Sequence, residues 1–323
     1  MAVVPARHRV GDGSAHAKVI LIGEHTVAHG SAAVALPMPA MTAHARAAHA
    51  SNSAAARLVP EGRPGVLRIG GPGFRPGTGP ELAVVAALRR WKITGTPLTV
   101  RTDTRIPVAR GLGSSAAVTA AAVHATAALV EQSLSDTDLA AFVQVGEQHS
   151  HGRPSGVDAA AAVSRGPIQF RAGVHAPIPI AGRALLLVAD TGVGAGPREA
   201  VGIASARLTG QSGLQLLRSA EQLTENAITQ LAQGDWTAVG RSLTAFHELL
   251  ANLGVSSHIL DRGVAAALEA GALGAKLTGG GLGGCLLALT DHPDTATGIR
   301  ERLHHSGARH VWTLPIEGAR NDH

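Results

Sequence analysis

The sequence contains few aromatic and few sulfur-containing residues. Its 323 residues include no tyrosine, four phenylalanines, three tryptophans and one cysteine, Cys285. Nucleic-acid binding through stacked aromatics is therefore disfavoured. The basic residues are scattered rather than clustered, so we expect no nucleic-acid partner despite the net charge of +5. One cysteine forms no intrachain disulfide and no cysteine-based metal site, which predicts a reducing, cytoplasmic location.

Long apolar runs are also missing. No stretch of about 18 apolar residues occurs, so we predict no membrane span. Residues 1–10 include basic side chains but no apolar segment, and a signal peptide is not expected. Hydrophobic residues nevertheless make up 45% of the chain, enough for a core built from Ala, Val, Leu and Ile. The length allows one large domain or two ordinary ones.

Alternation of apolar strands and amphipathic helices predicts an α+β protein. A boundary is expected within residues 160–185, because the pattern changes after Asp158. Strands are predicted at 19–22, 98–101, 184–189, 275–278, 286–289 and 310–314, and helices at 81–91, 114–132, 136–147, 213–232, 235–252, 257–270 and 293–305.

A glycine loop, Gly-Leu-Gly-Ser-Ser at residues 111–115, opens directly into an alanine-rich helix. Glycines let a backbone approach its ligand closely, and the N–H groups at a helix start attract anions. The loop therefore predicts a phosphate site, with Ser114 as the helix N-cap and the Ser115 hydroxyl within reach of a phosphate-bound Mg²⁺. No Gly-Lys-Ser/Thr follows, which excludes a Walker A motif. The alternative is an ordinary glycine-rich turn with a serine cap.

Two carboxylates belong to the next motif, residues 147–158. Glu147 lies on the apolar stripe of its predicted helix, where an unpaired carboxylate is costly and needs a cation. Magnesium prefers one or two carboxylates together with substrate phosphates. Asp158 follows a Pro-Ser-Gly turn, as a carboxylate brought to a site by a tight loop does. The alternatives are a salt-bridged structural glutamate and a helix-capping aspartate.

The third motif is a glycine cluster at residues 279–284, between two apolar strands. Glycine occupies five of its six positions. A backbone wall against a nucleotide explains so many glycines, and a flexible turn is the alternative. Lys18 precedes the predicted strand at 19–22, and Glu24 and His25 follow it. Lys18 beside an anionic site can stabilise phosphate charge, whereas in the alternative these charges are exposed flanks of a strand.

Together, these segments resemble the GHMP kinase superfamily, whose three motifs occur here in order over nearly the whole chain. Within the superfamily, residues 18–30 and the His-Gly-x-Pro-Ser-Gly-x-Asp run ending at Asp158 resemble the mevalonate kinases. The resemblance implies a two-domain α+β fold with the site in the cleft between the domains. Residues 1–170 are expected to form an N-terminal domain like ribosomal protein S5 domain 2, and residues 171–323 an α/β sandwich (ferredoxin-like) domain.

The resemblance also implies roles for single residues. Asp158 is expected to be the base for the C5 hydroxyl of mevalonate, with Lys18 near that hydroxyl and the γ-phosphate. Ser115 and Glu147 are expected to hold Mg²⁺, and Ser155 to support the active-site loop. Glu24 and His25 are expected to line the mevalonate pocket. The phosphates of ATP are expected to be wrapped by Gly111, Leu112, Gly113, Ser114 and Ser115.

Two departures from the family pattern stand out. Leu282 replaces a glycine of the third motif, and Pro197 stands where many relatives have Ser or Thr. Relatives are often homodimers, so the resemblance implies the same assembly. Two other functions stay open at this point: another kinase of the superfamily, acting on a sugar or on phosphomevalonate, and a non-catalytic sensor on the same fold.

Overall fold

The computed structural model of the protein describes residues 9–50, 65–70, 74–95, 97–151, 154–194 and 196–318. Gly152 and Arg153 of the 147–158 motif lie outside the described residues, and so does the side chain of Pro197. The chain folds into two compact units, each assembled from three segments. Unit 1 comprises Met1–Lys18, Pro37–Pro107 and Gly113–Arg165, and unit 2 comprises Val19–Leu36, Val108–Leu112 and Gly166–His323.

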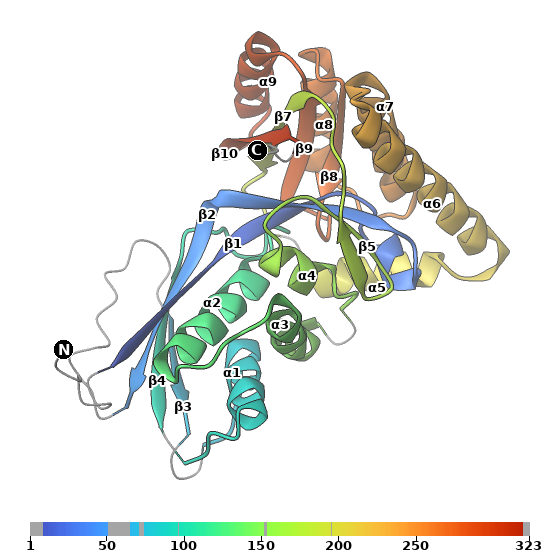
Figure 1. Ribbon diagram of the computed structural model, residues 1–323. Coiled ribbons are helices and arrows are strands. Elements are labelled where there is room, and N and C mark those ends of the chain that lie inside the picture. Colours follow the sequence, from blue (N-terminus) through green and yellow to red (C-terminus); the bar gives the residue numbers. More distant parts are fainter. Residues whose placement is uncertain are drawn as a thin grey trace. The chain divides into compact units, whose positions relative to one another are not determined.

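Unit 1 combines antiparallel strands with four helices, of which the first two pack on the strands. Strand β4 (Leu98–Thr104) lies between β3 (Gly65–Ile69) and β2 (Ala33–His49), and β2 also pairs with β1 (Val10–Ile22). Figure 1 shows the first three helices gathered on one side of β3 and β4. The helices of unit 1 are α1 (Gly79–Arg90), α2 (Ser114–Leu129), α3 (Asp136–His151) and α4 (Val157–Val163).

Close packing of β1 on α2 fixes the position of the candidate phosphate loop. A Cβ at Gly11 would lie 2.0 Å from the carbonyl oxygen of Ala125, and one at Gly13 would lie 2.3 Å from that of Ala121. Only glycines on the strand and small residues on the helix allow this approach. The alanine-rich composition of α2 therefore lets the helix pack against β1, the strand that also carries Lys18.

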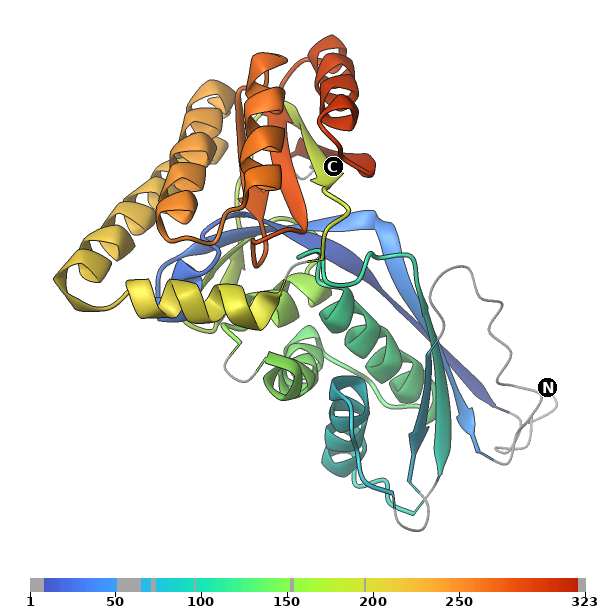
Figure 2. The ribbon, with the colours of Figure 1, turned by 180° about the vertical axis from the view of Figure 1, so that it is seen from behind.

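Unit 2 contains a four-stranded antiparallel sheet in the order β10-β7-β9-β8. The chain order β7, helices, β8, β9, helix, β10 gives the connectivity of a ferredoxin-like sheet, which confirms that prediction. Helices α7, α8 and α9 pack against this sheet (Figure 2). The strands are β7 (Arg183–Asp190), β8 (Gly274–Thr278), β9 (Cys285–Thr290) and β10 (His310–Glu317), and the helices are α5 (Pro197–Arg207), α6 (Gly210–Gln233), α7 (Trp236–Asn252), α8 (His258–Glu269) and α9 (Pro293–His305).

The rest of unit 2 surrounds the end of β1. The start of β2 pairs with β5 (Ile168–Arg171), which continues into the hairpin strand β6 (Val174–Pro177). A short 3-10 helix, η2 (Thr26–His29), connects β1 to β2 and contacts α6. Among the described residues, none of the helices is both long and apolar enough to cross a membrane.

Candidate functional site

A lysine and an aspartate form the centre of the site in unit 1. The Nζ atom of Lys18 lies 2.7 Å from Oδ1 of Asp158. The lysine side chain is 3% exposed and the aspartate side chain 34% exposed, so the pair is open to solvent only on the carboxylate side. Asp158 lies in the first turn of α4, after Gly156, whose φ of 98° forms the sharp entry to the helix. The structure thus brings together two residues that the sequence places 140 positions apart.

Glu147 supplies a second carboxylate to this centre. It is 1% exposed on α3, and it accepts a hydrogen bond from the side chain of Ser115. Burial and then the charge of Asp158 raise the pKa of Glu147 to about 7, while Ser115 and Lys18 act in the opposite direction. A buried carboxylate whose pKa is raised in this way favours binding of a cation. The predicted neighbours Lys18, Ser115, Glu147 and Asp158 therefore lie in one cluster.

The N-terminus of α2 borders this cluster. The helix begins at Ser114, and its N-cap is Gly113 in the left-handed conformation, with a φ of 72°. The prediction that Ser114 is the N-cap is therefore wrong, because the chain enters the helix one residue earlier; its hydroxyl donates to the carbonyl of Ile106 at 3.4 Å. A Cβ at Gly113 would lie 2.9 Å from Cγ of Lys18. Glycine at this position lets the lysine run close beside the helix start.

The first half of the glycine loop belongs to unit 2 and packs on the glycine cluster at residues 279–284. A Cβ at Gly279 would lie 2.5 Å from Cα of Gly111, so both positions need glycine for the two backbones to meet. Arg110, just before the loop, pairs through Nε with Oδ1 of Asp190 at 2.8 Å and donates from Nη2 to the carbonyl of Gly192 at 3.1 Å. The cluster at 279–284 thus supports the loop backbone.

Leu282, the departure within this cluster, adopts a left-handed conformation with a φ of 57°. Its N–H donates to the carbonyl of Val255 at 2.8 Å, and its side chain is half-buried. A non-glycine residue in this conformation costs roughly 1–2 kcal/mol. The leucine therefore keeps the turn that a glycine gives, at some cost in stability.

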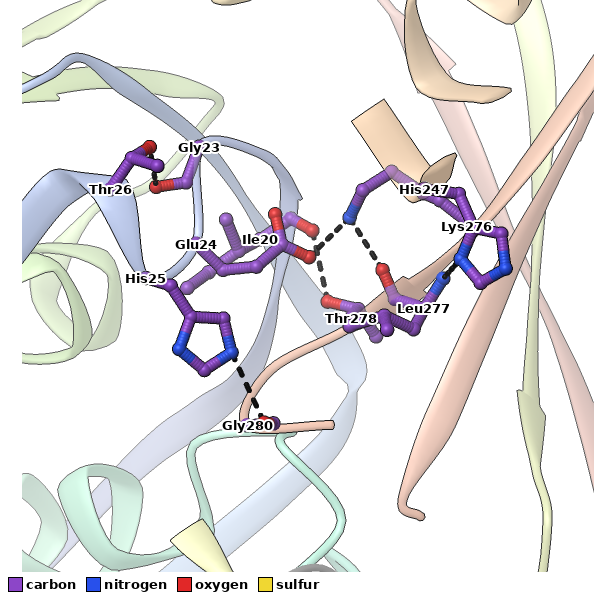
Figure 3. Close-up of polar contacts among 10 residues, drawn as sticks. All are labelled: Ile20, Gly23, Glu24, His25, Thr26, His247, Lys276, Leu277, Thr278 and Gly280. Carbon is purple, nitrogen blue, oxygen red and sulfur yellow. Dashed lines mark hydrogen bonds and ion pairs between the residues drawn. The ribbon is translucent and has the colours of Figure 1, made fainter. Parts of the chain in front are cut away.

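A buried ion pair in unit 2 was missed by the sequence analysis. Lys276 on β8 is fully buried and pairs with Glu24, which follows β1 and is 2% exposed (Figure 3). Burial lowers the pKa of Lys276, and Glu24 opposes that shift. The sequence signal was a lysine at the centre of the short apolar segment Gly-Ala-Lys-Leu-Thr, where a charge requires a partner. The partner lies 252 positions away, beyond any local pattern.

His25 lies next to Glu24 on the same turn, and its side chain points toward the glycine cluster (Figure 3). Its Nε2 lies 3.1 Å from the carbonyl oxygen of Gly280. A carbonyl only accepts, so Nε2 carries the proton. Burial lowers the pKa of His25 to about 4, against the opposing effect of that hydrogen bond, so the ring is neutral. Its Nδ1 is then an acceptor, which suits a hydroxyl group.

Ser155, the remaining predicted site residue, lies in the turn before α4. Its hydroxyl accepts a hydrogen bond from the N–H of Val157 at 3.3 Å. The contact closes the turn that leads into Asp158, and the role of Ser155 in supporting the active-site loop stays a prediction. Its contribution to substrate binding stays a prediction.

Comparison with known proteins identifies the family. The GHMP kinases N terminal domain matches residues 81–166, and the GHMP kinases C terminal domain matches residues 227–309. The mevalonate kinase of Aeropyrum pernix is 33% identical over 335 residues, covering 97% of this chain and 98% of that protein. The mevalonate kinase of Pyrococcus abyssi is 30% identical, covering 89% and 91%.

This chain belongs to the mevalonate kinase family of GHMP kinases. The crystal structure of the L. major mevalonate kinase in complex with R-mevalonate superimposes with a TM-score of 0.78 at 27% identity, covering 99% of both chains. The predicted two-domain GHMP kinase fold is confirmed by these matches. As a member of the family, the chain is an ATP-dependent kinase.

Proposed function

We propose that this chain transfers the γ-phosphate of ATP to the C5 hydroxyl of (R)-mevalonate, giving 5-phosphomevalonate and ADP in isoprenoid biosynthesis. The observation that carries the proposal is the Lys18–Asp158 pair, whose carboxylate is open to solvent beside Glu147 and the start of α2. Mevalonate as the acceptor rests on the relatives, which are mevalonate kinases over nearly their full length.

In this mechanism, Asp158 accepts the proton of the C5 hydroxyl. The freed oxygen lone pair forms a bond to the γ-phosphorus, and the bond from that phosphorus to the bridging oxygen breaks, so that ADP leaves with the electron pair. Lys18 holds Asp158 in place and offsets the negative charge on the transferred group. A positioned base contributes typically about 10²–10⁴-fold to the rate. Gly111 to Ser115 supply the N–H groups that bind the phosphates.

The donor set of unit 1 fits Mg²⁺. Glu147 and the Ser115 hydroxyl are hydrogen-bonded neighbours, and the raised pKa of Glu147 is what an added cation would lower. Oxygen donors of this kind, with one or two carboxylates, match the preference of Mg²⁺. We propose that these two residues hold the ion, which when bound neutralises charge on the ATP phosphates.

Glu24 and His25 are proposed to form the wall of the mevalonate pocket, with His25 offering Nδ1 to a substrate hydroxyl and Glu24 holding the turn behind it.

Three further features stay proposals: a division of the chain near residue 170, a homodimer, and a cytoplasmic location. The location is supported by Cys285, which is the sole cysteine and is buried in β9. Light scattering of the purified chain tests the dimer.

A coupled ADP-release assay tests the function. It uses Mg-ATP with (R)-mevalonate, phosphomevalonate, galactose and homoserine in parallel. We expect turnover with mevalonate alone. Galactose belongs in the panel because the galactokinase of Mycobacterium bovis is 30% identical over 61% of this chain. Turnover confined to another acceptor would overturn the choice of substrate, and ATP binding without turnover on any acceptor would favour a sensor.

A further inference from the structure

The ion pair between Lys276 and Glu24 joins two segments at the centre of unit 2. The Lys276 ammonium contacts Glu24, donates to the carbonyl of Leu277 at 2.5 Å, and lies 5.7 Å from the centre of the Phe246 ring. Every residue of β8 is buried, so the lysine cannot reach water. The ammonium donates to Glu24 and to the Leu277 carbonyl, and it keeps a charged partner only if Glu24 stays where it is.

Two further contacts connect the same segments. The Thr278 hydroxyl donates to the carbonyl of Ile20 at 2.9 Å, and His25 donates to Gly280. The three ties alternate along the chain at residues 276, 278 and 280, and they bind the end of β1 and the following turn (Figure 3). The ion pair is the strongest of the three contacts electrostatically, and it is made by Glu24, the residue directly before His25.

The turn that carries His25 needs such support. His25 has a φ of 62°, and Gly23 has a φ of 103°. Left-handed backbone at a non-glycine residue persists only where the surroundings hold it. Local bonds close the turn, since the N–H of Thr26 donates to the carbonyl of Glu24 at 2.7 Å. Glu24, one position before the strained residue, is fixed from the other side by Lys276.

Replacing a buried ion pair by apolar side chains of similar volume is often neutral or stabilising. The pair therefore has to be explained by something other than stability, and its geometry suggests the placement of His25. An apolar pair would fill the same volume, but it has no directional hydrogen bond and so would not fix the orientation of the Glu24–His25 turn.

We propose that Lys276 is a positioning residue for acceptor binding, which acts through Glu24 to hold the turn that presents His25. The inference rests on the proposed function, because it takes His25 to contact mevalonate. Lys276 itself is too deeply buried to touch a substrate. Its loss should therefore weaken mevalonate binding while leaving the ATP side unchanged.

Steady-state kinetics of Lys276→Met test this inference. We expect KM for mevalonate to rise about tenfold or more, with KM for ATP within about twofold of wild type. Leu303→Ala is the matched control, because it removes a fully buried side chain of α9, a helix of unit 2 that packs on β7, β9 and β10. It should lower the melting temperature and leave both KM values unchanged. Equal behaviour of the two variants would overturn the inference.

A double variant separates positioning from folding. Lys276→Met combined with Glu24→Leu removes both charges, so we expect the melting temperature to recover toward that of wild type. If Lys276 positions His25, KM for mevalonate stays raised in the double variant. If KM recovers together with the melting temperature, the pair is merely structural and the inference is wrong. The double variant also provides a folded protein should Lys276→Met alone fail to fold.

A nuclear magnetic resonance measurement keeps this inference distinct from the proposed function. The Nε2–H signal of His25, assigned by its loss in His25→Gln, reports the hydrogen bond to Gly280 without substrate. We expect this signal to shift or exchange faster in Lys276→Met and to stay unchanged in Leu303→Ala. An unchanged signal in Lys276→Met would contradict the positioning role. A wild-type chain that does not phosphorylate mevalonate would instead contradict the proposed function.

Discussion

Two lysine–carboxylate pairs occupy the two units, and they differ in exposure. In the Lys18–Asp158 pair the carboxylate side chain is 34% exposed, whereas in the Lys276–Glu24 pair it is 2% exposed. The carboxylate of the lysine–carboxylate pair is thus accessible to solvent in unit 1 and buried in unit 2. An open carboxylate can meet a substrate and exchange a proton, while a closed one can act only on the groups packed around it.

The difference teaches how to assign roles to charged residues in this fold. Both lysines are almost fully buried, so lysine burial alone does not distinguish them. The surroundings of the carboxylate do. Asp158 is partly exposed beside Glu147, whereas Glu24 is buried against Lys276, which itself lies over the Phe246 ring. We therefore assign catalysis to the first pair and placement of a neighbouring residue to the second.

The largest expected effect is at the open carboxylate. Asp158→Asn keeps the shape of the side chain but removes the base, so kcat should fall about 10²–10⁴-fold. Because the position is partly exposed, stability should change by less than about 1 kcal/mol. ADP release gives the rate, and calorimetric titration with a non-hydrolysable ATP analogue checks that nucleotide binding is retained. Wild-type turnover in this variant would exclude Asp158 as the base.

The second prediction compares the two lysines by stability. Lys276→Met leaves Glu24 buried without its cation and should cost about 3–5 kcal/mol of unfolding free energy. Lys18→Met leaves Asp158, a carboxylate that water still reaches, and should cost less than Lys276→Met. Urea unfolding of both variants measures the difference. Equal losses would break the distinction between a closed and an open pair.

The third prediction concerns Glu147, whose pKa is raised from 4.5 to about 7. As pH rises, Glu147 loses its proton in the unfolded chain before it does so in the folded chain. Its contribution to the free energy of unfolding therefore falls as pH rises between those two values. Glu147→Gln removes the penalty and should stabilise the protein by roughly 1–3 kcal/mol at about pH 8, with little gain at about pH 4. Thermal unfolding without Mg²⁺ across this range measures the effect.

The same variant also tests the metal site. With an ATP analogue present, added Mg²⁺ should raise the melting temperature of the wild type more than that of Glu147→Gln. A stability gain at alkaline pH together with a weaker response to Mg²⁺ is the expected combination. Identical responses to Mg²⁺ would remove Glu147 from the ligand set.

The smallest expected effect is at the entry to the phosphate loop. Arg110 uses Nε and Nη2 for two different partners, Asp190 and Gly192, which a lysine cannot reproduce. Arg110→Lys should therefore raise KM for ATP about fivefold and leave KM for mevalonate unchanged. Arg171→Lys, at a surface ion pair of unit 2, is the control and should change neither value. An unchanged KM for ATP in Arg110→Lys would show that the loop holds its shape without this contact.

Much of the fold could be predicted because its pattern is local. The helix at 293–305 matches α9 (Pro293–His305), and β8 and β9 lie within one residue of their predicted starts. Strand β1 is far longer than the predicted strand at 19–22: it begins at Val10 and includes Gly11 and Gly13, which pack closely on α2. Such packing follows from a helix about a hundred positions later in the chain, which no local pattern reveals.

The candidate site was predictable to a similar extent. The glycine loop, Lys18, Glu147 and Asp158 could be singled out because each lies in a recognisable local motif. Lys276 could not, since its meaning depends on Glu24 at the other end of the chain. The N-cap of α2 was misassigned because serine is the commoner cap, while here a left-handed Gly113 makes room for Lys18.

The most direct test of the central claim is the identity of the product. The wild-type chain is incubated with Mg-ATP and (R)-mevalonate, and phosphorus-31 magnetic resonance follows the reaction. Our account predicts one new phosphomonoester signal, coupled to the C5 methylene protons, that grows in step with ADP. ADP formation without that signal, or no reaction under conditions in which ATP binds, would contradict it.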